Sequence, residues 1–272
     1  MSRADTVSGP QGTLPPTIRL TPPSGCLFLH RVAAKRSALS LSVICRQTVG
    51  IGRRLYERGL IVAAEGNISV RLSDGNVLVT PAGMCKGLMK ATDLVVVDTA
   101  GRKMQGSREP SSELKMHLVA LARRSDVGAC VHAHPPYATA FAVAGIPLTD
   151  DVLPEVITTI RSVPLAPYAT PSTAAVGESI RGLVDRFDAI LLKNHGVLTL
   201  GADLESAFRK METVERFAQI VWLARSLGKV DTFPPAEVET LLDLSRRTVA
   251  REPVAEKRTG RKSPAGRKRT SN

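Results

Sequence analysis

Two histidines separated by one residue, His132 and His134, have the side-chain type and spacing of a pair of metal ligands. Alternate side chains of a β-strand share a face, so the two imidazoles would point the same way, about 7 Å apart along the backbone. The apolar run 127–131 before them favours a strand, and Pro135-Pro136 would end it. Two histidines that lie by chance at the end of a strand, with no metal-binding role, would give the same pattern. A catalytic zinc site also needs a third protein ligand, so the pair predicts at most half of a metal site.

The composition favours one large domain with tails, or two small domains. The 272 residues are 43% hydrophobic, which is enough for a sizeable core. No apolar run approaches the roughly 18 residues that cross a bilayer, and the segment 24–29 is too short for a signal peptide. The four cysteines include no CxxC pair, which is typical of a reducing compartment. We therefore expect a cytoplasmic protein without a membrane partner.

The net charge of +12 is concentrated at the two ends of the chain. Residues 257–272 carry +7 and residues 1–36 carry +4, so the 220 residues between them keep only +1. Residues 1–36 also contain five prolines and no hydrophobic period, and we predict a disordered leader there. Residues 249–272 are predicted to be a basic disordered tail. Nucleic acid is not an expected partner, apart from a weak polyanion contact of this tail.

The first half of the folded part predicts a helix, a hairpin and a strand. Apolar residues at helical spacing begin after Ser37, and Gly59 would end that helix. Two β-rich runs, 65–72 and 76–80, flank an Asp-Gly pair, which is a strong hairpin signal because both residues tolerate positive φ. A further strand is expected at 93–97.

A helix is predicted from residue 114, where apolar residues recur at helical spacing. Ser111 or Ser112 would be its N-cap, and Glu113 would lie in the first turn, where the helix dipole favours negative charge. Helix capping accounts for one of the serines and for Glu113, with no catalytic or binding role for either. It does not need both serines, and a helix start with hydroxyl groups also suits a phosphate.

The apolar stretch 189–200 is interrupted by Asn194-His195-Gly196. We predict one strand whose polar triplet marks a binding site, because such residues are out of place in a packed strand. Further helices are expected at 136–144, 172–187, 204–227 and 236–244.

Five short motifs, taken together and in this order, resemble the class II aldolase/adducin family, in its sugar-phosphate aldolase and epimerase branch. They are EGNISVR (65–71), TPAGM (80–84), PSSE (110–113), HAH (132–134) and NHG (194–196). The resemblance covers roughly residues 40–245. It implies a single α/β domain of three layers, here residues 37–248, with a mainly antiparallel central sheet flanked by helices. It also implies a homotetramer with active sites at the subunit interfaces.

The same resemblance implies the residues of the site. His195 joins His132 and His134 as a ligand of Zn²⁺, in an open site that leaves room for substrate oxygens. Glu113 matches the catalytic carboxylate, which can hold the fourth position at rest and then act as acid and base. The phosphate pocket of the substrate matches four residues: Asn67, Gly83, Ser111 and Ser112.

The activity implied is that of a zinc-dependent aldolase that cleaves a small phosphorylated ketose to dihydroxyacetone phosphate and an aldehyde through a metal-bound enediolate. Alternatives with the same fold are a sugar-phosphate 4-epimerase, a methylthioribulose-phosphate-type dehydratase and a sugar-acid phosphate decarboxylase. A non-catalytic adducin-like interaction module is a further alternative, which the complete histidine set and Glu113 disfavour.

The chain departs from the fuculose-phosphate branch of the family in its proton donor. That branch has an acid tyrosine after the HxH strand and another near the C-terminus, but residues 146–160 contain no tyrosine and none follows Tyr168. Ala82 also stands where a hydroxyl residue is common. Glu155 or Tyr137 are the candidates for a substitute donor, and the substrate itself stays open.

Overall fold

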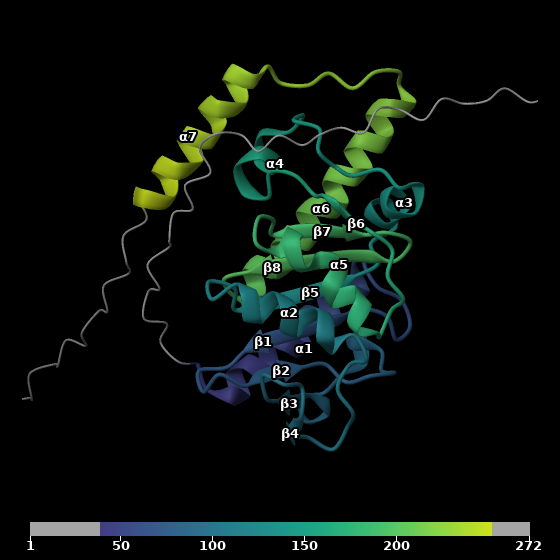
Figure 1. Ribbon diagram of the computed structural model, residues 1–272, viewed down its shortest axis with the longest axis vertical. Coiled ribbons are helices and arrows are strands. Elements are labelled where there is room, and N and C mark those ends of the chain that lie inside the picture. The colour runs from purple at the N-terminus through teal and green to yellow at the C-terminus, as the bar shows by residue number, and fades with distance from the viewer. Residues whose placement is uncertain (1–38, 252–272) are drawn as a thin grey trace, which may run out of the picture. The chain divides into compact units, whose positions relative to one another are not determined.

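A computed structural model describes residues 39–251 of the chain, with side chains as far as Arg246. Its strands form one eight-stranded sheet in the order β4-β3-β2-β1-β5-β8-β7-β6 (Figure 1). Every neighbouring pair is antiparallel except β6 and β7. The strands are β1 (Asn67–Arg71), β2 (Val77–Val79), β3 (Val95–Val97), β4 (Lys103–Gln105), β5 (Ala129–Ala133), β6 (Leu165–Ala166), β7 (Ala189–Leu192) and β8 (Gly196–Gly201). The predicted mainly antiparallel sheet is confirmed.

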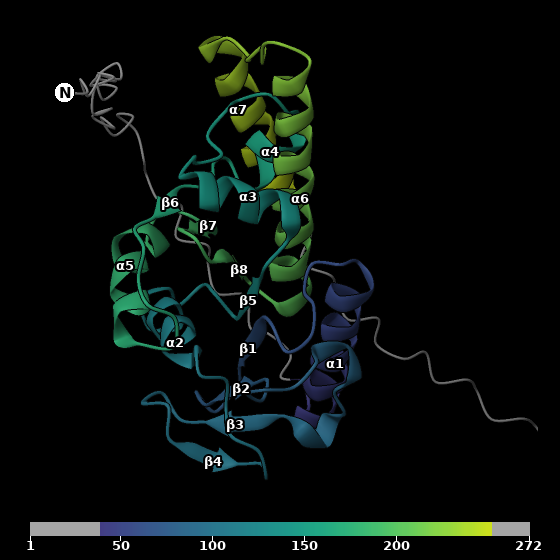
Figure 2. The same ribbon diagram turned by 90° about the vertical axis from the view of Figure 1, so that its right-hand side faces the viewer.

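Helices cover both faces of this sheet, which confirms the three-layer α/β prediction. Figure 2 shows α2 and α5 on one side of the strands and α1 and α6 on the other. Each layer of helices encloses its own apolar core against the sheet. The described helices are α1 (Leu41–Glu57), α2 (Leu114–Arg123), α3 (Pro136–Ala144), α4 (Pro154–Thr159), α5 (Ala174–Val184), α6 (Leu204–Ser226) and α7 (Pro235–Arg251), with short 3₁₀ turns at Lys86–Leu88 and Ala91–Asp93.

The central strand β5 is buried along its whole length, as expected for a strand covered on both faces. Val131 and the alanines beside it pack into the core under α1, α3 and α6, whereas Cys130 packs into the core under α2 and α5. Because side chains alternate along a strand, His132 points to the same side as Cys130. That side is where α2 begins.

Several predicted elements differ from the observed ones at their ends. The first helix begins at Leu41, four residues after the predicted start, with Ser40 as its N-cap residue. The last helix, α7, runs to Arg251 and so passes the predicted end at 244. The predicted leader and most of the predicted basic tail lie outside the described residues, so the domain boundaries at 36/37 and 248/249 stay predictions. None of the described helices is both long and apolar enough to cross a membrane.

The largest difference concerns the stretch 189–200, which is not one strand. β7 and β8 form a tight antiparallel hairpin whose three-residue turn is Lys193-Asn194-His195, and Gly196 of the triplet is the first residue of β8. Asn194 has a φ of +55°, a left-handed conformation that asparagine tolerates better than most residues. Two apolar strands with a short turn between them look, in sequence, like one interrupted strand. The hairpin matters for the site because it places His195 at the end of β8, beside the end of β5.

Candidate metal and catalytic site

The three predicted histidines come together at the ends of the adjacent strands β5 and β8. His132, His134 and His195 each offer a ring nitrogen, and these three atoms lie within 4.8 Å of one another. The ring centroids are 4.7 to 5.0 Å apart. Ala133 pairs with Val197 in the β5–β8 ladder, so the sheet register itself brings His195 to the other two.

The surroundings of two of these rings decide which nitrogen faces the centre of the group. His132 donates its Nδ1–H to the carbonyl oxygen of Val197 at 2.9 Å, so its Nε2 carries a free lone pair. The Nδ1 of His134 lies 3.5 Å from a carboxylate oxygen of Glu65. The Nε2 atoms of His132 and His134 then face each other at 3.0 Å. Burial and the nearby His132 lower the pKa of His134 to about 4, so its ring is neutral near pH 7, as a metal ligand must be.

Glu113 turns its carboxylate toward the same group. It is itself the N-cap residue of α2, so the prediction of Ser111 or Ser112 at that position was wrong. The hydroxyl oxygen of Ser111 instead accepts a hydrogen bond from the backbone N–H of Glu113 at 3.3 Å. The carboxylate Oε2 lies 3.2 Å from His132 Nε2, and Oε1 lies 3.1 Å from His195 Nε2.

These distances fit a divalent metal ion. Four ligands at about 2.05 Å from a tetrahedral ion are separated by about 3.3 Å. Three contacts in the group come close to this: His132–His134 at 3.0 Å, His195–Glu113 at 3.1 Å and His132–Glu113 at 3.2 Å. The Oε1 atom of Glu113 is buried and has no hydrogen-bond partner in the described structure. A bare carboxylate oxygen and imidazole lone pairs that converge on one point are a donor set for a cation.

The charge state of Glu113 follows from the same neighbours. Burial by itself raises the pKa of the carboxyl, but the adjacent His132 and His195 imidazoles lower the pKa by more and hold it well below its usual range. The carboxylate is therefore ionised at neutral pH.

The residues predicted for a phosphate pocket lie on three neighbouring segments beside Glu113. The Thr80–Gly83 loop runs against the segment before α2, since Ala82 N–H donates to the Glu109 carbonyl at 3.0 Å and Ser111 N–H donates to the Thr80 carbonyl at 3.1 Å. Ser111 is buried, while Ser112 and Gly83 are exposed. Asn67 is the first residue of β1, and the next residue, Ile68, is hydrogen-bonded to Thr80. The side-chain amide of Asn67 donates to Glu113 Oε2 at 2.8 Å. Asn67 is thus tied to the carboxylate, a contact that the sequence did not suggest.

Crowding around the histidine strands explains the glycines of the EGN and NHG motifs. A Cβ atom on Gly196 would lie 2.6 Å from the carbonyl oxygen of Ala133 and 2.6 Å from the ring of His134. A Cβ atom on Gly66, whose φ is +67°, would lie 2.8 Å from the carbonyl oxygen of His132. Both glycines therefore let the backbone approach the ligands closely.

We expect Gly196→Ala to weaken metal binding and to destabilise the fold. The added methyl group must push either β5 or the His134 ring aside, and such overpacking costs about 1–3 kcal/mol. The melting temperature and the zinc affinity would show both effects. Gly182→Ala in α5 is the matched control, because a Cβ there meets nothing within 4 Å. A Gly196→Ala protein with the parental affinity and melting temperature would contradict the expectation.

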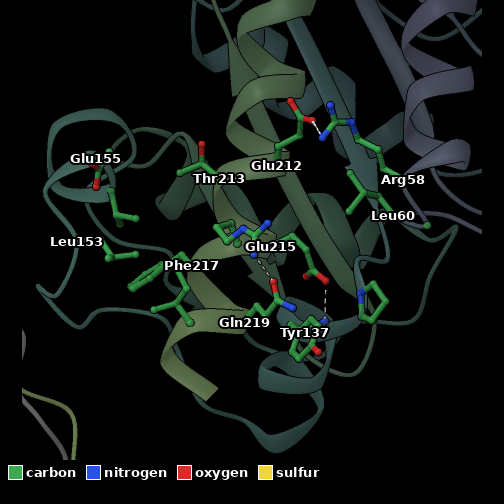
Figure 3. Close-up of a pocket in the computed structure, with 15 residues that line it drawn as sticks. Arg58, Leu60, Tyr137, Leu153, Glu155, Glu212, Thr213, Glu215, Phe217 and Gln219 are labelled. Atoms are coloured by element: carbon green, nitrogen blue, oxygen red, sulfur yellow. Dashed lines mark hydrogen bonds and ion pairs between the residues drawn. The ribbon is translucent and has the colours of Figure 1, made fainter. Parts of the chain in front are cut away.

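A cavity of about 770 Å³ lies between α6, α3 and α4, and none of the three histidines lines it. Its lining includes Tyr137 and Glu155, the two candidates for a substitute proton donor (Figure 3). The lining residue Phe217 belongs to the core under α1, α3 and α6, whereas Glu113 begins a helix on the other face of the sheet. Within one chain, the structure does not bring either candidate donor to the histidine group.

Glu215 holds the helix that follows the HAH motif. Figure 3 shows its carboxylate beside Tyr137, and its two oxygens accept the backbone N–H groups of Tyr137 at 3.0 Å and Ala138 at 2.9 Å. A carboxylate at a helix N-terminus satisfies donors that have no partner within the helix. α3 starts two residues after His134, so this contact also anchors the metal-binding segment.

Replacing Glu215 with alanine is expected to cost about 1–2 kcal/mol of stability, the usual effect of a lost helix cap. Urea denaturation would measure the change in the free energy of unfolding. Glu239→Ala, at an exposed position of α7, is the control. Equal stability of the two variants would show that the cap contributes nothing.

Two residues near the site, Glu65 and Ser69, were missed in the sequence, although Glu65 is part of the EGN motif. Glu65 lies behind His134, and Ser69 contacts His117. His117 follows Glu113 by one helical turn, a position that favoured packing over a ligand role, and its ring is buried against Asn67.

Comparison with known proteins agrees with this geometry. Residues 46–222 match the family model described as Class II Aldolase and Adducin N-terminal domain. The 5-deoxy-D-ribulose 1-phosphate aldolase of Bacillus thuringiensis serovar kurstaki is 33% identical over 199 residues, which are 72% of this chain and 92% of that protein. The 3-oxo-tetronate 4-phosphate decarboxylase of Pectobacterium atrosepticum is 33% identical over 65% of this chain and 83% of its own length.

A solved structure of an L-fuculose 1-phosphate aldolase superposes with a TM-score of 0.72 at 31% identity, covering 77% of this chain and 98% of that one. These relatives are named aldolases and decarboxylases, so the prediction of an enzyme of the class II aldolase type is confirmed. The chain belongs to the class II aldolase and adducin family.

Proposed function

We propose that this protein is a zinc-dependent lyase that cleaves a small phosphorylated ketose to dihydroxyacetone phosphate and an aldehyde. The observation that carries the proposal is the convergence of three imidazoles and the Glu113 carboxylate beside the 80–83 loop and the start of α2. A metal site and an anion-binding loop, side by side, suit a substrate that has a carbonyl and a phosphate close together.

His132, His134 and His195 would hold the ion. Three neutral imidazoles with a displaceable fourth group form the open site that catalytic zinc uses. When bound, Zn²⁺ supplies a Lewis acid for the substrate carbonyl, which lowers the cost of the negative charge left after carbon–carbon bond cleavage. The Val197 carbonyl and the Glu65 carboxylate support the first two rings from behind.

Glu113 is proposed to move the proton at the carbon that becomes the hydroxymethyl group of dihydroxyacetone phosphate. Its carboxylate is ionised and largely buried, and it lies on the histidine group itself, as a general acid and base must. Gly83, Ser111 and Ser112 would bind the phosphate through backbone N–H groups and hydroxyls. Asn67 has a second side-chain N–H besides the one that it gives to Glu113, and this second N–H would bind the same phosphate.

A decarboxylase acting on a sugar-acid phosphate is the second candidate. One relative at 33% identity is named as such an enzyme. The chain also has no tyrosine in residues 146–160, and the described structure keeps Tyr137 and Glu155 in the cavity on the other face of the sheet. Retro-aldol cleavage must take a proton from the hydroxyl group whose oxygen becomes the aldehyde carbonyl, whereas loss of CO₂ from a carboxylate needs no such proton transfer. The two reactions otherwise use the same site.

A substrate panel measured before and after metal removal tests both candidates. Ketose 1-phosphates would be followed by the dihydroxyacetone phosphate formed, and 3-oxo sugar-acid phosphates by the CO₂ released; epimer and dehydration products would be scored in parallel. We expect one class of phosphorylated substrate to react, and a chelator to abolish turnover until Zn²⁺ is restored. Full activity of protein shown by elemental analysis to be metal-free would contradict the proposal. Purified protein that binds no metal at all would favour the adducin-like module.

Assembly into a homotetramer is proposed as well. α3, α6 and the C-cap residue of α6 expose large apolar side chains, among them Val143, Trp222, Leu223 and Leu227, which an assembly would bury. Light scattering of the purified chain would test it, with a monomeric mass as the contrary result. The predicted polyanion contact of the basic tail and the cytoplasmic location stay predictions.

A further inference from the structure

A chain of hydrogen bonds leads from the interior of the protein to Glu113. The Ser69 hydroxyl meets His117 Nδ1 at 2.7 Å, and His117 Nε2 meets the Asn67 carbonyl oxygen Oδ1. The Asn67 amide then donates to Glu113 Oε2 at 2.8 Å. Ser69 and His117 are fully buried, and Asn67 is nearly so. Buried polar side chains are costly unless each is hydrogen-bonded, and Ser69, His117 and Asn67 all are.

The contact between Asn67 and Glu113 determines the direction of every hydrogen bond in the series from Ser69 to Glu113. The NH₂ group of Asn67 faces Glu113, because its Nδ2–H donates to the carboxylate Oε2 at 2.8 Å. The Asn67 carbonyl oxygen therefore faces His117, and because it only accepts, His117 must carry its proton on Nε2. Nδ1 is then the acceptor for the Ser69 hydroxyl. The structure thus assigns a single tautomer to His117.

His117 is a fixed donor and not an acid or base. Its ring is completely buried, and burial together with the nearby His132 lowers the pKa of His117 to about 3. A ring that stays neutral keeps the same hydrogen at the same atom throughout the working range of pH.

The hydrogen bonds from Ser69 to Glu113 leave the two carboxylate oxygens of Glu113 in different environments. Oε2 is held by Asn67, whereas Oε1 is buried without a hydrogen-bond partner and lies 3.1 Å from His195 Nε2. If the Asn67 amide turned over, its carbonyl oxygen would face the carboxylate, and two acceptors would repel. The hydrogen on His117 Nε2 is what prevents this turn.

We infer that His117 is a positioning residue that acts through Asn67, and that it holds Glu113 so that Oε1 is the oxygen that carries the proton during catalysis. This inference rests on the proposed function, since it says which atom of Glu113 performs the proton transfer. It gives a task to a buried histidine that binds neither the metal nor the substrate.

Two variants separate this role from simple core packing. His117→Phe fills the space but has no N–H, and His117→Gln can place an amide N–H near the position of Nε2. We expect kcat to fall about tenfold in the phenylalanine variant, a change that corresponds to about 1.4 kcal/mol. The glutamine variant should recover to within about threefold of the parent, with zinc affinity unchanged in both. Equal losses in the two variants, at equal melting temperature, would overturn the inference.

Nitrogen-15 NMR of the zinc-loaded, full-length protein tests the assignment without relying on activity or on variants that fold poorly. The chain has five histidines, so the His117 signals can be recognised by their loss in His117→Gln. We expect the Nε2–H tautomer, unchanged between about pH 5 and pH 9. An Nδ1–H tautomer, or a ring that titrates in this range, would refute the inference and leave any lyase activity as it was. Absence of lyase activity with the expected tautomer would instead refute the proposed function.

Discussion

Replacing His132 with alanine is expected to remove metal binding and lyase activity together. This ring is fully buried, and its Nε2 contacts two other members of the group, His134 Nε2 at 3.0 Å and Glu113 Oε2 at 3.2 Å. Loss of a residue that only supports a ligand typically costs 10- to 100-fold in metal affinity, so loss of the ligand itself should cost more than about 100-fold.

Zinc titration and thermal unfolding would both report this loss. Ions that bind only the folded state stabilise it, so a chelator should lower the melting temperature of the parent protein. The same chelator should leave the melting temperature of His132→Ala unchanged. His30→Ala, in the predicted leader, is the matched histidine control. A His132→Ala protein that retains stoichiometric zinc would show that the ion is held elsewhere.

Glu113→Gln is expected to give the second large effect, on kcat and not on the metal. Glutamine keeps the size of the side chain and can still contact Asn67, but it cannot take up a proton. Loss of a positioned acid and base typically slows a reaction about 100- to 10,000-fold. Metal content measured by elemental analysis should remain at one ion per chain, because the three imidazoles are intact.

The control for this variant is Glu109→Gln, four residues earlier in the segment that leads to α2. Its carboxylate is exposed and pairs with Lys103, so its loss should leave turnover unchanged. Equal turnover of Glu113→Gln and the parent would exclude Glu113 as the acid and base. A matching loss in Glu109→Gln would show that a general effect of charge, and not Glu113 itself, controls the rate.

Much of the site could be predicted from the sequence because its parts are short and local. The HAH spacing predicts two imidazoles on one face of a strand. β5 ends at Ala133, one residue before His134, and the two rings still lie together with their centroids 4.9 Å apart. The Asp-Gly hairpin and the helix at 136–144 depend on neighbouring residues alone, and both were found where predicted. The membership of His195 and the three-layer architecture came from the resemblance of five ordered motifs, not from spacing.

The tertiary structure decided everything that depends on which segments lie side by side. His195 meets His132 across 63 residues of chain only because β8 pairs with β5, and β8 begins there only because Asn194 turns the chain back. Sequence patterning interpreted Asn194-His195-Gly196 as a polar interruption of one strand, because a binding site within one strand and a short turn between two strands look alike in the sequence.

The partners of buried polar groups are likewise chosen through space. Asn67 lies 46 residues from Glu113 and 50 from His117, and no local pattern joins them. By itself, the sequence determined the chemical groups of this protein: three imidazoles, a carboxylate, a glycine-containing loop and two serines before a helix. The fold decided which atom of each group faces the centre, because orientation depends on hydrogen bonds that form only when distant segments pack together.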